Sequence, residues 1–193
     1  MKRSPSRSKE ATRERIVDVA ARAIRCSGYH GTGVADIMKA AGLTHGGFYA
    51  HFPSRDALLA EAADRAGLES VRSLQNLAAG SSGPQALQAM IHGYLSKGHL
   101  ESVEVGCHFA SLATEMPRQV PEVRHAATRR LKEGIDLIAR QFSDWGSQAA
   151  HERALVTMAT MVGTMAMARA VDDPALSDAL REAAIKHLDQ ISH

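Results

Sequence analysis

Residues 41–58, with the sequence AGLTHGGFYAHFPSRDAL, carry polar side chains and glycines in a pattern that could read DNA. Two short helices on either side of the turn 42–44 would have the length and the turn glycine of a helix-turn-helix. In that motif the second helix enters the major groove, and its first residues reach the edges of the bases. The chemistry this stretch predicts is therefore hydrogen bonding to bases and phosphates.

The second helix of this motif is predicted to begin with Thr44 and His45, which could contact bases. Gly46 and Gly47 follow, although a glycine inside a helix costs about 1 kcal/mol of helix propensity. Two glycines at these positions are better explained by a close approach of the backbone to the DNA groove than by packing within the protein. We therefore include both glycines among the DNA-binding residues.

Phosphate contacts are expected beside the base contacts. Tyr49, His51 and Arg55 are the candidates after the recognition helix. A basic N-terminal arm could add attraction that is independent of sequence, through Lys2, Arg3, Arg7 and Lys9. Phe48 and Phe52, in contrast, are large and apolar and are predicted to form the core of this small unit.

The distribution of charge supports a polyanionic partner for one end of the chain. The net charge is only +2, yet residues 1–55 hold ten Lys and Arg against four Asp and Glu, while residues 56–193 hold thirteen against seventeen. The basic end coincides with the predicted helix-turn-helix and its arm. We therefore expect that end to meet nucleic acid.

Composition and length indicate an ordinary soluble globular protein of 193 residues, with 45% apolar and 23% charged residues. The two cysteines lie 81 positions apart and predict no disulfide framework, which favours a reducing, cytoplasmic location. The opening MKRSPSRSKE lacks the apolar region of a signal peptide. The apolar, uncharged stretch 154–168 is shorter than the roughly 18 residues of a membrane span, so no membrane partner is expected.

The periodicity of apolar residues predicts an all-α fold of about nine helices and no sheet. An N-terminal three-helix helix-turn-helix domain is expected over residues 1–53. Residues 54–193 would form a helical effector-binding and dimerisation domain. The helices are expected near 16–27, 34–41, 44–52, 54–79, 84–95, 106–115, 121–146, 148–171 and 174–191. Cys26, within the first helix, is expected to be buried.

About residues 10–60 resemble the N-terminal signature of the TetR family of transcriptional repressors, in one register without gaps. The residues that carry this resemblance are GYHGTGV at 28–34, Ile37, AAGLT at 40–44, Gly46, Phe48-Tyr49, His51-Phe52 and RDAL at 55–58. The sequence departs from the signature at Gly33, where Ser or Thr is usual, and at Gly47, where Thr, Ser or Ala is common. The rest of the chain is similar to the family in length and helix count.

This resemblance implies a homodimeric transcriptional repressor that binds a double-stranded, near-palindromic DNA operator and is released by a small-molecule effector. It places Thr44, His45 and Gly47 against bases. It assigns phosphate contacts to Thr32, Tyr49, His51 and Arg55. The long helix near 54–79 would link the DNA to the effector site.

A dimer face is expected on the last two helices. The helix near 148–171 carries a bulky stripe of Leu155, Met158, Val162 and Met165. It also carries a small stripe, Ala159, Gly163, Ala166 and Ala170, that would let another helix approach closely. The final helix would join the interface through Leu180, Ala184 and Leu188. Packing of the small stripe within one chain remains the alternative.

The effector or sensor site is predicted from residues on helices that should surround the middle of the larger domain. They are Met90, Tyr94, Cys107, Phe142, Trp145, Met161 and Met165. Methionines adapt to irregular apolar ligands, but a methionine stripe at helical spacing is also typical of plain core. Both interpretations stay open.

Cys107 follows Gly106 at a predicted helix start, where backbone N–H groups favour a thiolate. The Gly-Cys pair resembles that of some electrophile- and oxidant-sensing members of the family. A thiol-sensing repressor is therefore the alternative function, with an activator of the same fold as another. The spacing of His92, His99, Cys107 and His108 does not match a zinc motif. No orienting residue can be assigned to a Cys-His pair, so neither a metal, a cofactor nor an enzyme is expected.

Overall fold

The computed structural model describes residues 5–191, with side chains from residue 8 to residue 190. Within that range every regular element is a helix, which confirms the all-α class. None of these helices is long and apolar enough to cross a bilayer. The elements are α1 (Pro5–Ser27), α2 (Val34–Ala40), η1 (His45–Ala50), α3 (Arg55–Leu77), α4 (Gly83–Tyr94), α5 (Lys97–Glu101), η2 (Val103–Val105), α6 (His108–Leu112), η3 (Met116–Arg118), α7 (Pro121–Ala139), α8 (Gln148–Ala170) and α9 (Pro174–Ile191), where η marks a 3-10 helix.

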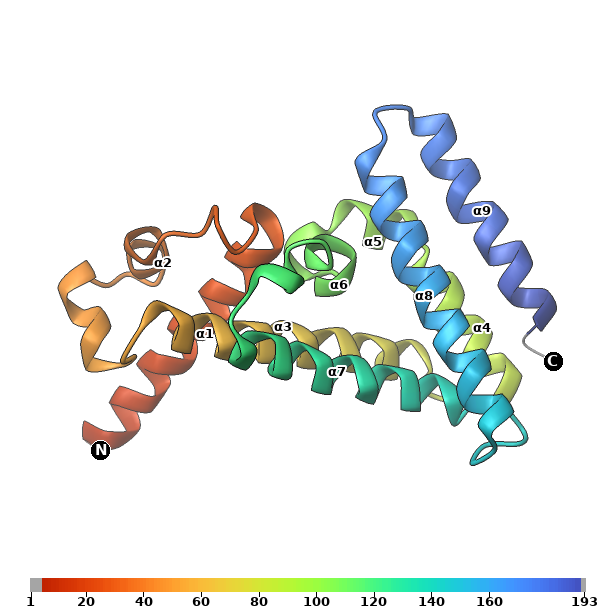
Figure 1. Ribbon diagram of the computed structural model, residues 1–193, viewed down its shortest axis with the longest axis horizontal. Helices are drawn as coiled ribbons and strands as arrows, with labels where there is room; N and C mark the ends of the chain where they lie inside the picture. The colour runs from red at the N-terminus through yellow and green to blue at the C-terminus, as the bar shows by residue number, and fades with distance from the viewer. Residues whose placement is uncertain (1–4, 192–193) are drawn as a thin grey trace.

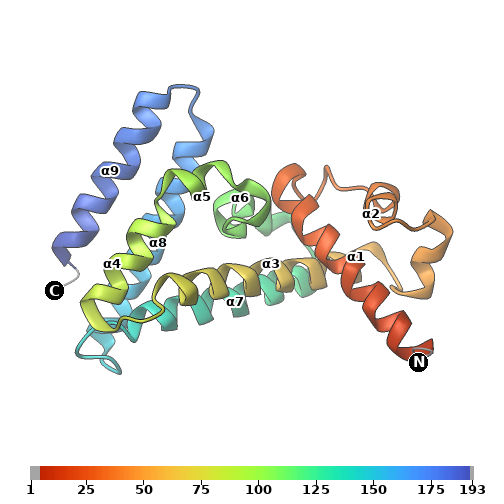
Figure 2. The same cartoon turned by 180° about the vertical axis from the view of Figure 1, so that it is seen from behind.

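The molecule is elongated, with α1 and α2 at one end and α4, α8 and α9 at the other (Figure 1). The long helix α3 runs from the first end into the second, and α7 lies beside it (Figures 1 and 2). Ser54 caps the start of α3, since its Oγ accepts a hydrogen bond from the N–H of Ala57 at 3.1 Å. Helix α3 therefore connects the two ends of the molecule without a break.

Two apolar cores divide the molecule, and α3 contributes to both. Leu58, Ala62 and Ala66 belong to the first core, together with residues of α1, α2 and η1, whereas Leu74 belongs to the second. The first core also takes in Leu112 of α6 and Val123 of α7. The apolar packing therefore passes from the first core to the second along α3, between Ala66 and Leu74.

Several helices differ from the expected ranges. Helix α1 begins at Pro5, so Lys9 lies on a helix and not on an extended arm, while Lys2 and Arg3 lie outside the described residues, as does the side chain of Arg7. The expected helix 106–115 is shortened to α6, and α5 was not predicted. Helix α7 ends at Ala139 and not near residue 146. In the turn that follows, the Ser147 hydroxyl donates to the Asp144 carboxylate at 2.8 Å before α8 begins.

Helix α9 packs against α8 and α4 through one face. Ser177 donates from its Oγ to the carbonyl of Ala168 at 2.8 Å, and Arg181 donates to the carbonyl of Leu95 at 2.9 Å. Ala184 and Leu188 continue this face into the second core. The prediction that Ala184 and Leu188 form the dimer face is therefore wrong, because the spacing of four, three and four from Ser177 turns them inward.

Candidate nucleic-acid interface and ligand cavity

The predicted helix-turn-helix is formed by α2, a tight turn and η1. Gly42 has a φ of +70°, a left-handed conformation that favours glycine, and the N–H of Leu43 donates back to the carbonyl of Met38 at 2.8 Å. The second element is a 3-10 helix and not the expected α-helix over 44–52. Two consecutive glycines, Gly46 and Gly47, weaken α-helical propensity there.

One side of η1 is held in the core and the other is exposed. Phe48 and Phe52 are buried with their rings stacked at 5.7 Å, which confirms their predicted core role. Thr44 and His45 are exposed, and Tyr49 is 73% exposed, with an edge contact to Phe48. Polar side chains without a packing role thus lie together on the outer surface of the motif.

Neither glycine of η1 is required by packing in this structure. A Cβ on Gly46 would have no described atom within 4 Å, and one on Gly47 would only reach ordinary contact with Met38 and Thr44. The backbone of both residues also avoids positive φ. At these two positions no side chain lies between the backbone of η1 and its surroundings.

Two of the predicted phosphate contacts, Thr32 and Arg55, make hydrogen bonds inside the protein. Thr32 is 4% exposed and its hydroxyl donates to the carbonyl of Gly28 at 2.6 Å, so its side chain offers no free group to DNA. Arg55 is half-buried and donates to the carbonyls of Tyr29 and Thr32, the latter at 3.2 Å. Arg55 therefore joins the α1–α2 loop to the start of α3. His51 is half-buried, and its Nδ1 has no hydrogen-bond partner in the described part of the chain.

Ion pairs hold α1 against α3 along the length of their contact. Arg13 pairs with Glu61, Arg65 pairs with Asp18, and the fully buried Arg25 side chain pairs with Glu69 at 2.6 Å. Arg25 also donates to the carbonyls of Ala66 and Glu104, both at 2.9 Å, so its guanidinium is used inside the protein. Cys26, expected to be buried, is exposed beside it. A displacement of α3 would therefore carry α1 with it.

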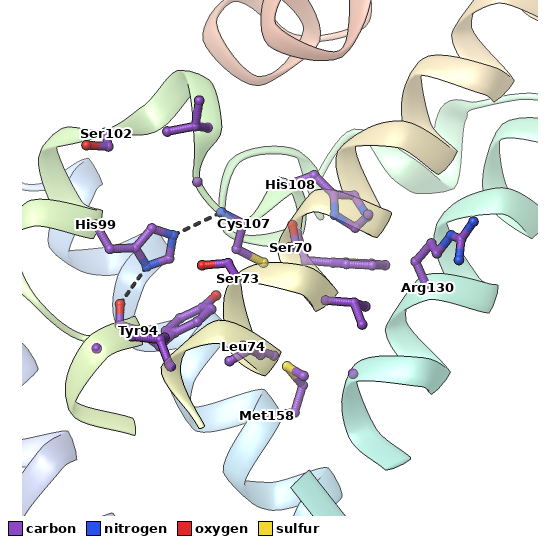
Figure 3. Close-up of a pocket in the computed structure, with 18 of the residues that line it drawn as sticks. Ser70, Ser73, Leu74, Tyr94, His99, Ser102, Cys107, His108, Arg130 and Met158 are labelled. Carbon is purple, nitrogen blue, oxygen red and sulfur yellow. Dashed lines mark hydrogen bonds between the residues drawn. The ribbon is translucent and has the colours of Figure 1, made fainter. Parts of the chain in front are cut away.

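A cavity of about 250 Å³ lies in the larger domain between α3, α7 and the segment from Tyr94 to Phe109 (Figure 3). Close helix packing shapes one side of it. A Cβ on Gly67 of α3 would lie 2.5 Å from the Cβ of Arg130 on α7, so only glycine fits there. Leu74, Leu131 and Met158 supply apolar wall.

His99 holds the segment that carries Cys107. Its Nδ1 donates to the carbonyl of Tyr94 at 2.5 Å, and its Nε2 accepts the backbone N–H of Cys107 at 2.9 Å, the roles of a neutral imidazole (Figure 3). Burial lowers the pKa of His99, in agreement with that neutral form. Burial, and secondarily the neighbouring Cys107, raise the pKa of Tyr94 well above its ordinary value.

His108 is 2% exposed and lines the same cavity, and neither ring nitrogen has a hydrogen-bond partner in the described part of the chain. Burial first, and the nearby guanidinium of Arg25 second, lower the pKa of His108 to about 3. The ring is therefore neutral at physiological pH. It can both donate and accept one hydrogen bond, and it does neither with the described residues.

We expect His108 to make the folded protein sensitive to mild acid. An unfolded chain protonates this histidine near pH 6.5, whereas the folded protein keeps it neutral down to about pH 3. Between these values the unfolded state binds more protons, so the free energy of unfolding falls as pH falls, by up to about 1.4 kcal/mol per pH unit. His99 acts in the same direction. Urea unfolding at about pH 7 and about pH 5 measures the difference.

The substitution His108→Leu should reduce the pH dependence of the free energy of unfolding. The part of that dependence contributed by His99 should remain. His125→Leu is the matched control, because His125 is exposed on α7. An equal loss of stability between the two pH values in wild-type protein and His108→Leu would contradict the assignment.

Only part of the predicted effector site lines the cavity. Tyr94 and Cys107 do so. Trp145 is wrong as a cavity residue, because it is 55% exposed and stacks under Arg140 at 5.1 Å. Four others pack in the second core without lining the cavity: Met90, Phe142, Met161 and Met165. The predicted effector site lacked Gly67, His99 and His108, which line the cavity. For Gly67 the available signal was a glycine inside a helical pattern.

The histidines considered for metal binding are dispersed. His92 is exposed and pairs with Asp189 at 2.9 Å, whereas His99 is bonded to Tyr94 and Cys107. Within the described residues, no three His, Cys, Asp or Glu side chains form a group that could hold a metal ion.

The small stripe of α8 is not covered by the described residues of the chain. Ala159 is exposed, Gly163 and Ala166 are half-buried, and a Cβ on Gly163 would meet no described atom within 4 Å. On the adjacent α9, Leu180 is half-buried. Larger apolar side chains are exposed on the same two helices, among them Leu155, Val156, Met167 and Leu176.

The fold and the exposed motif define a helix-turn-helix transcriptional regulator. Residues 16–62 match the model for bacterial regulatory proteins of the tetR family, and residues 84–184 match the C-terminal domain of LmrA/YxaF-like transcriptional regulators. The chain belongs to the TetR family.

Known proteins support this assignment over most of the chain. The HTH-type transcriptional regulator Rv0196 of Mycobacterium tuberculosis is 33% identical over 169 residues, which are 83% of this chain and 85% of the relative. A TetR regulator structure from Chloroflexus aurantiacus has a TM-score of 0.79 at 27% identity and covers 95% of each chain. The reduced form of E. coli NemR has a TM-score of 0.78 at 21% identity, covering 93% of this chain and 96% of the other, which shows a shared fold.

Proposed function

We propose that this protein is a repressor that binds a near-palindromic operator as a homodimer and leaves it when a small molecule enters the cavity. One observation carries the proposal: α3 begins at the DNA-binding motif and then lines the cavity. Arg55 braces the motif, and Gly67, Ser70 and Leu74 of the same helix reach the cavity wall. The distance from Arg55 to Gly67 along the helix is about 18 Å.

The proposed coupling is a shift of α3. Ion pairs tie α3 to α1, and Asp64 of α3 is bound by Arg129 and Arg130 of α7 at 2.5 and 2.7 Å. A ligand that displaces the cavity wall would move α3 and α1 together and change the separation of the two recognition elements. Both elements of a dimer could then no longer enter successive major grooves.

The direct test starts from genomic fragments selected by the purified protein. We expect a near-palindromic site that binds two chains, and repression of the adjacent promoter in a transcription assay. Activation of that promoter would support the alternative of an activator with the same fold. A site without symmetry that binds one chain would overturn the proposed dimeric mode.

The open space around Gly46 leads to a prediction for Gly46→Ala. The methyl group has free space within the monomer and the backbone of Gly46 avoids positive φ, so alanine should raise the stability by about 0.4–1 kcal/mol, because it reduces the conformational entropy of the unfolded chain. If the backbone of Gly46 approaches the groove, the same methyl group should weaken operator binding. Thermal unfolding and operator titration measure the two effects. The control Thr128→Ala, on the exposed side of α7, raises helix propensity and should leave operator affinity unchanged.

A second candidate mechanism involves Cys107, which lines the cavity beside Tyr94 and is 8% exposed. An electrophile that enters the cavity could add to its Sγ and fill the same space covalently. Alkylated protein that keeps full operator affinity would exclude this route and leave reversible binding as the mechanism.

A further inference from the structure

The wall of the cavity contains two deeply buried polar side chains that lack a strong hydrogen-bond partner among the described residues. His108 is 2% exposed with both ring nitrogens unpartnered, and the Tyr94 hydroxyl, in a side chain that is 4% exposed, has only the weakly hydrogen-bonding thiol of Cys107 as a described polar neighbour. Buried polar groups in native proteins are normally hydrogen-bonded, and leaving them unpaired destabilises the fold. Two such groups on one cavity wall indicate a ligand that satisfies them.

The charged groups around the cavity are already neutralised or bonded. Among the described residues that line it, Arg130 is the one charged side chain, and it pairs with Asp64 and Glu133 at 2.7 and 2.8 Å. Arg25, near His108, is bound to Glu69, and Arg169 donates to backbone carbonyls and to Ser111. A carboxylate in the cavity would find no unpaired cation on the described wall, and an ammonium group would find no carboxylate. An uncharged ligand avoids that desolvation penalty.

The shape of the cavity limits the size of the ligand and the positions of its polar groups. A cavity of about 150 Å³ holds benzene, so one of about 250 Å³ accepts a molecule somewhat larger than one ring. His108 and Tyr94 lie on opposite sides of Cys107 (Figure 3). Leu74 and Met158 supply apolar wall below them.

We propose that the effector is an uncharged, mainly apolar molecule of about two fused rings in size, with a hydroxyl or carbonyl group at each end. One end would hydrogen-bond to His108 and the other to Tyr94. This inference rests on the proposed function, because it names the chemical class of the inducer at the same cavity.

Three probes of matched shape test the class: 2,6-dihydroxynaphthalene, naphthalene, and naphthalene-2,6-dicarboxylate. Binding to the free protein is measured by calorimetry. We expect the diol to bind about tenfold or more tighter than naphthalene, and the dicarboxylate not to bind. Absence of saturable diol binding at millimolar concentration, or preference for the dicarboxylate, would overturn the inference.

Two variants locate the binding groups. His108→Leu and Tyr94→Phe should each lower the affinity for the diol about tenfold and leave naphthalene binding nearly unchanged. His108→Leu should also raise the melting temperature of the free protein, because it removes unpaired buried polar atoms. The control His125→Leu, on the exposed side of α7, should change neither quantity. Equal diol affinity in wild-type protein and both variants would contradict the assigned contacts.

A measurement of protein release from operator DNA distinguishes a failure of this inference from a failure of the proposed function. Diol that binds as expected but leaves the operator complex intact would support the ligand class and contradict the proposed release. Protein that is released from its operator by other molecules, while diol binding is absent, would support the proposed function and contradict the ligand class.

Discussion

Replacing Tyr49 with alanine is expected to abolish specific operator binding while leaving the fold intact. The side chain is 73% exposed and touches the core only through an edge contact with Phe48, so its loss removes little packing. A tyrosine hydroxyl bonded to a phosphate contributes about 1.5–3 kcal/mol, and a dimer makes that contact in both half-sites. The combined loss should lower operator affinity by about 100-fold or more.

Two further variants make this experiment specific. Tyr49→Phe removes the hydroxyl and keeps the ring, so it should account for most of the loss if the phosphate bond is the cause. Trp145→Ala removes another exposed aromatic residue, 55% exposed in the turn between α7 and α8 at the far end of the molecule. It should leave operator titrations unchanged. Wild-type affinity in Tyr49→Ala would exclude this face of η1 as the DNA contact.

The long helix α3 could be predicted from the sequence, but the salt bridges and buried hydrogen bonds that hold it to the rest of the protein could not. The apolar periodicity of α3 and its Ser54 cap are local properties of the sequence, and both are found in the structure. The bonds of Arg25 to Glu104, and of Arg55 to Tyr29, join residues 79 and 26 positions apart. Tertiary packing places these backbone carbonyls beside the two arginines, and the local sequence does not predict it.

The cavity illustrates a second limit. Methionines and aromatics on the central helices predicted an apolar interior, and Met90 and Met161 are indeed buried in it. Whether a buried side chain faces another side chain or an open space depends on small differences in helix separation. Here Gly67 brings α3 close to α7, and the cavity opens beside this contact, next to His108. Those distances are not encoded in apolar spacing.

The apolar residues of α9 alone did not predict which face of this helix packs against the rest of the chain. Its apolar residues occupy two adjacent faces, one with Leu176 and Leu180 and the other with Ala184 and Leu188. Polar residues decided between them, because Ser177 and Arg181 both find buried carbonyl partners in α8 and after α4. The side chain of Leu176 is left exposed. We propose that this outer face of α9, together with the small stripe of α8, and not the inner face, pairs two chains.

Placing arginine at Gly163 is therefore expected to separate the dimer. A side chain there has free space in the monomer, so the fold should remain stable, and replacing glycine should raise helix propensity. In a dimer the arginine would stand between closely approaching helices and bury an unpaired charge. Sedimentation at micromolar concentration should show dimers for the wild type and monomers for Gly163→Arg.

Loss of the dimer should also weaken operator binding, because two linked recognition elements gain about 10²–10⁴ in affinity over one. Thr128→Arg, on the exposed side of α7, is the matched control and should stay dimeric with normal operator affinity. A wild-type protein that sediments as a monomer, or a Gly163→Arg variant that remains a dimer, would show that the small stripe of α8 does not join the two chains. Retained operator affinity in monomeric Gly163→Arg would mean that one recognition element suffices.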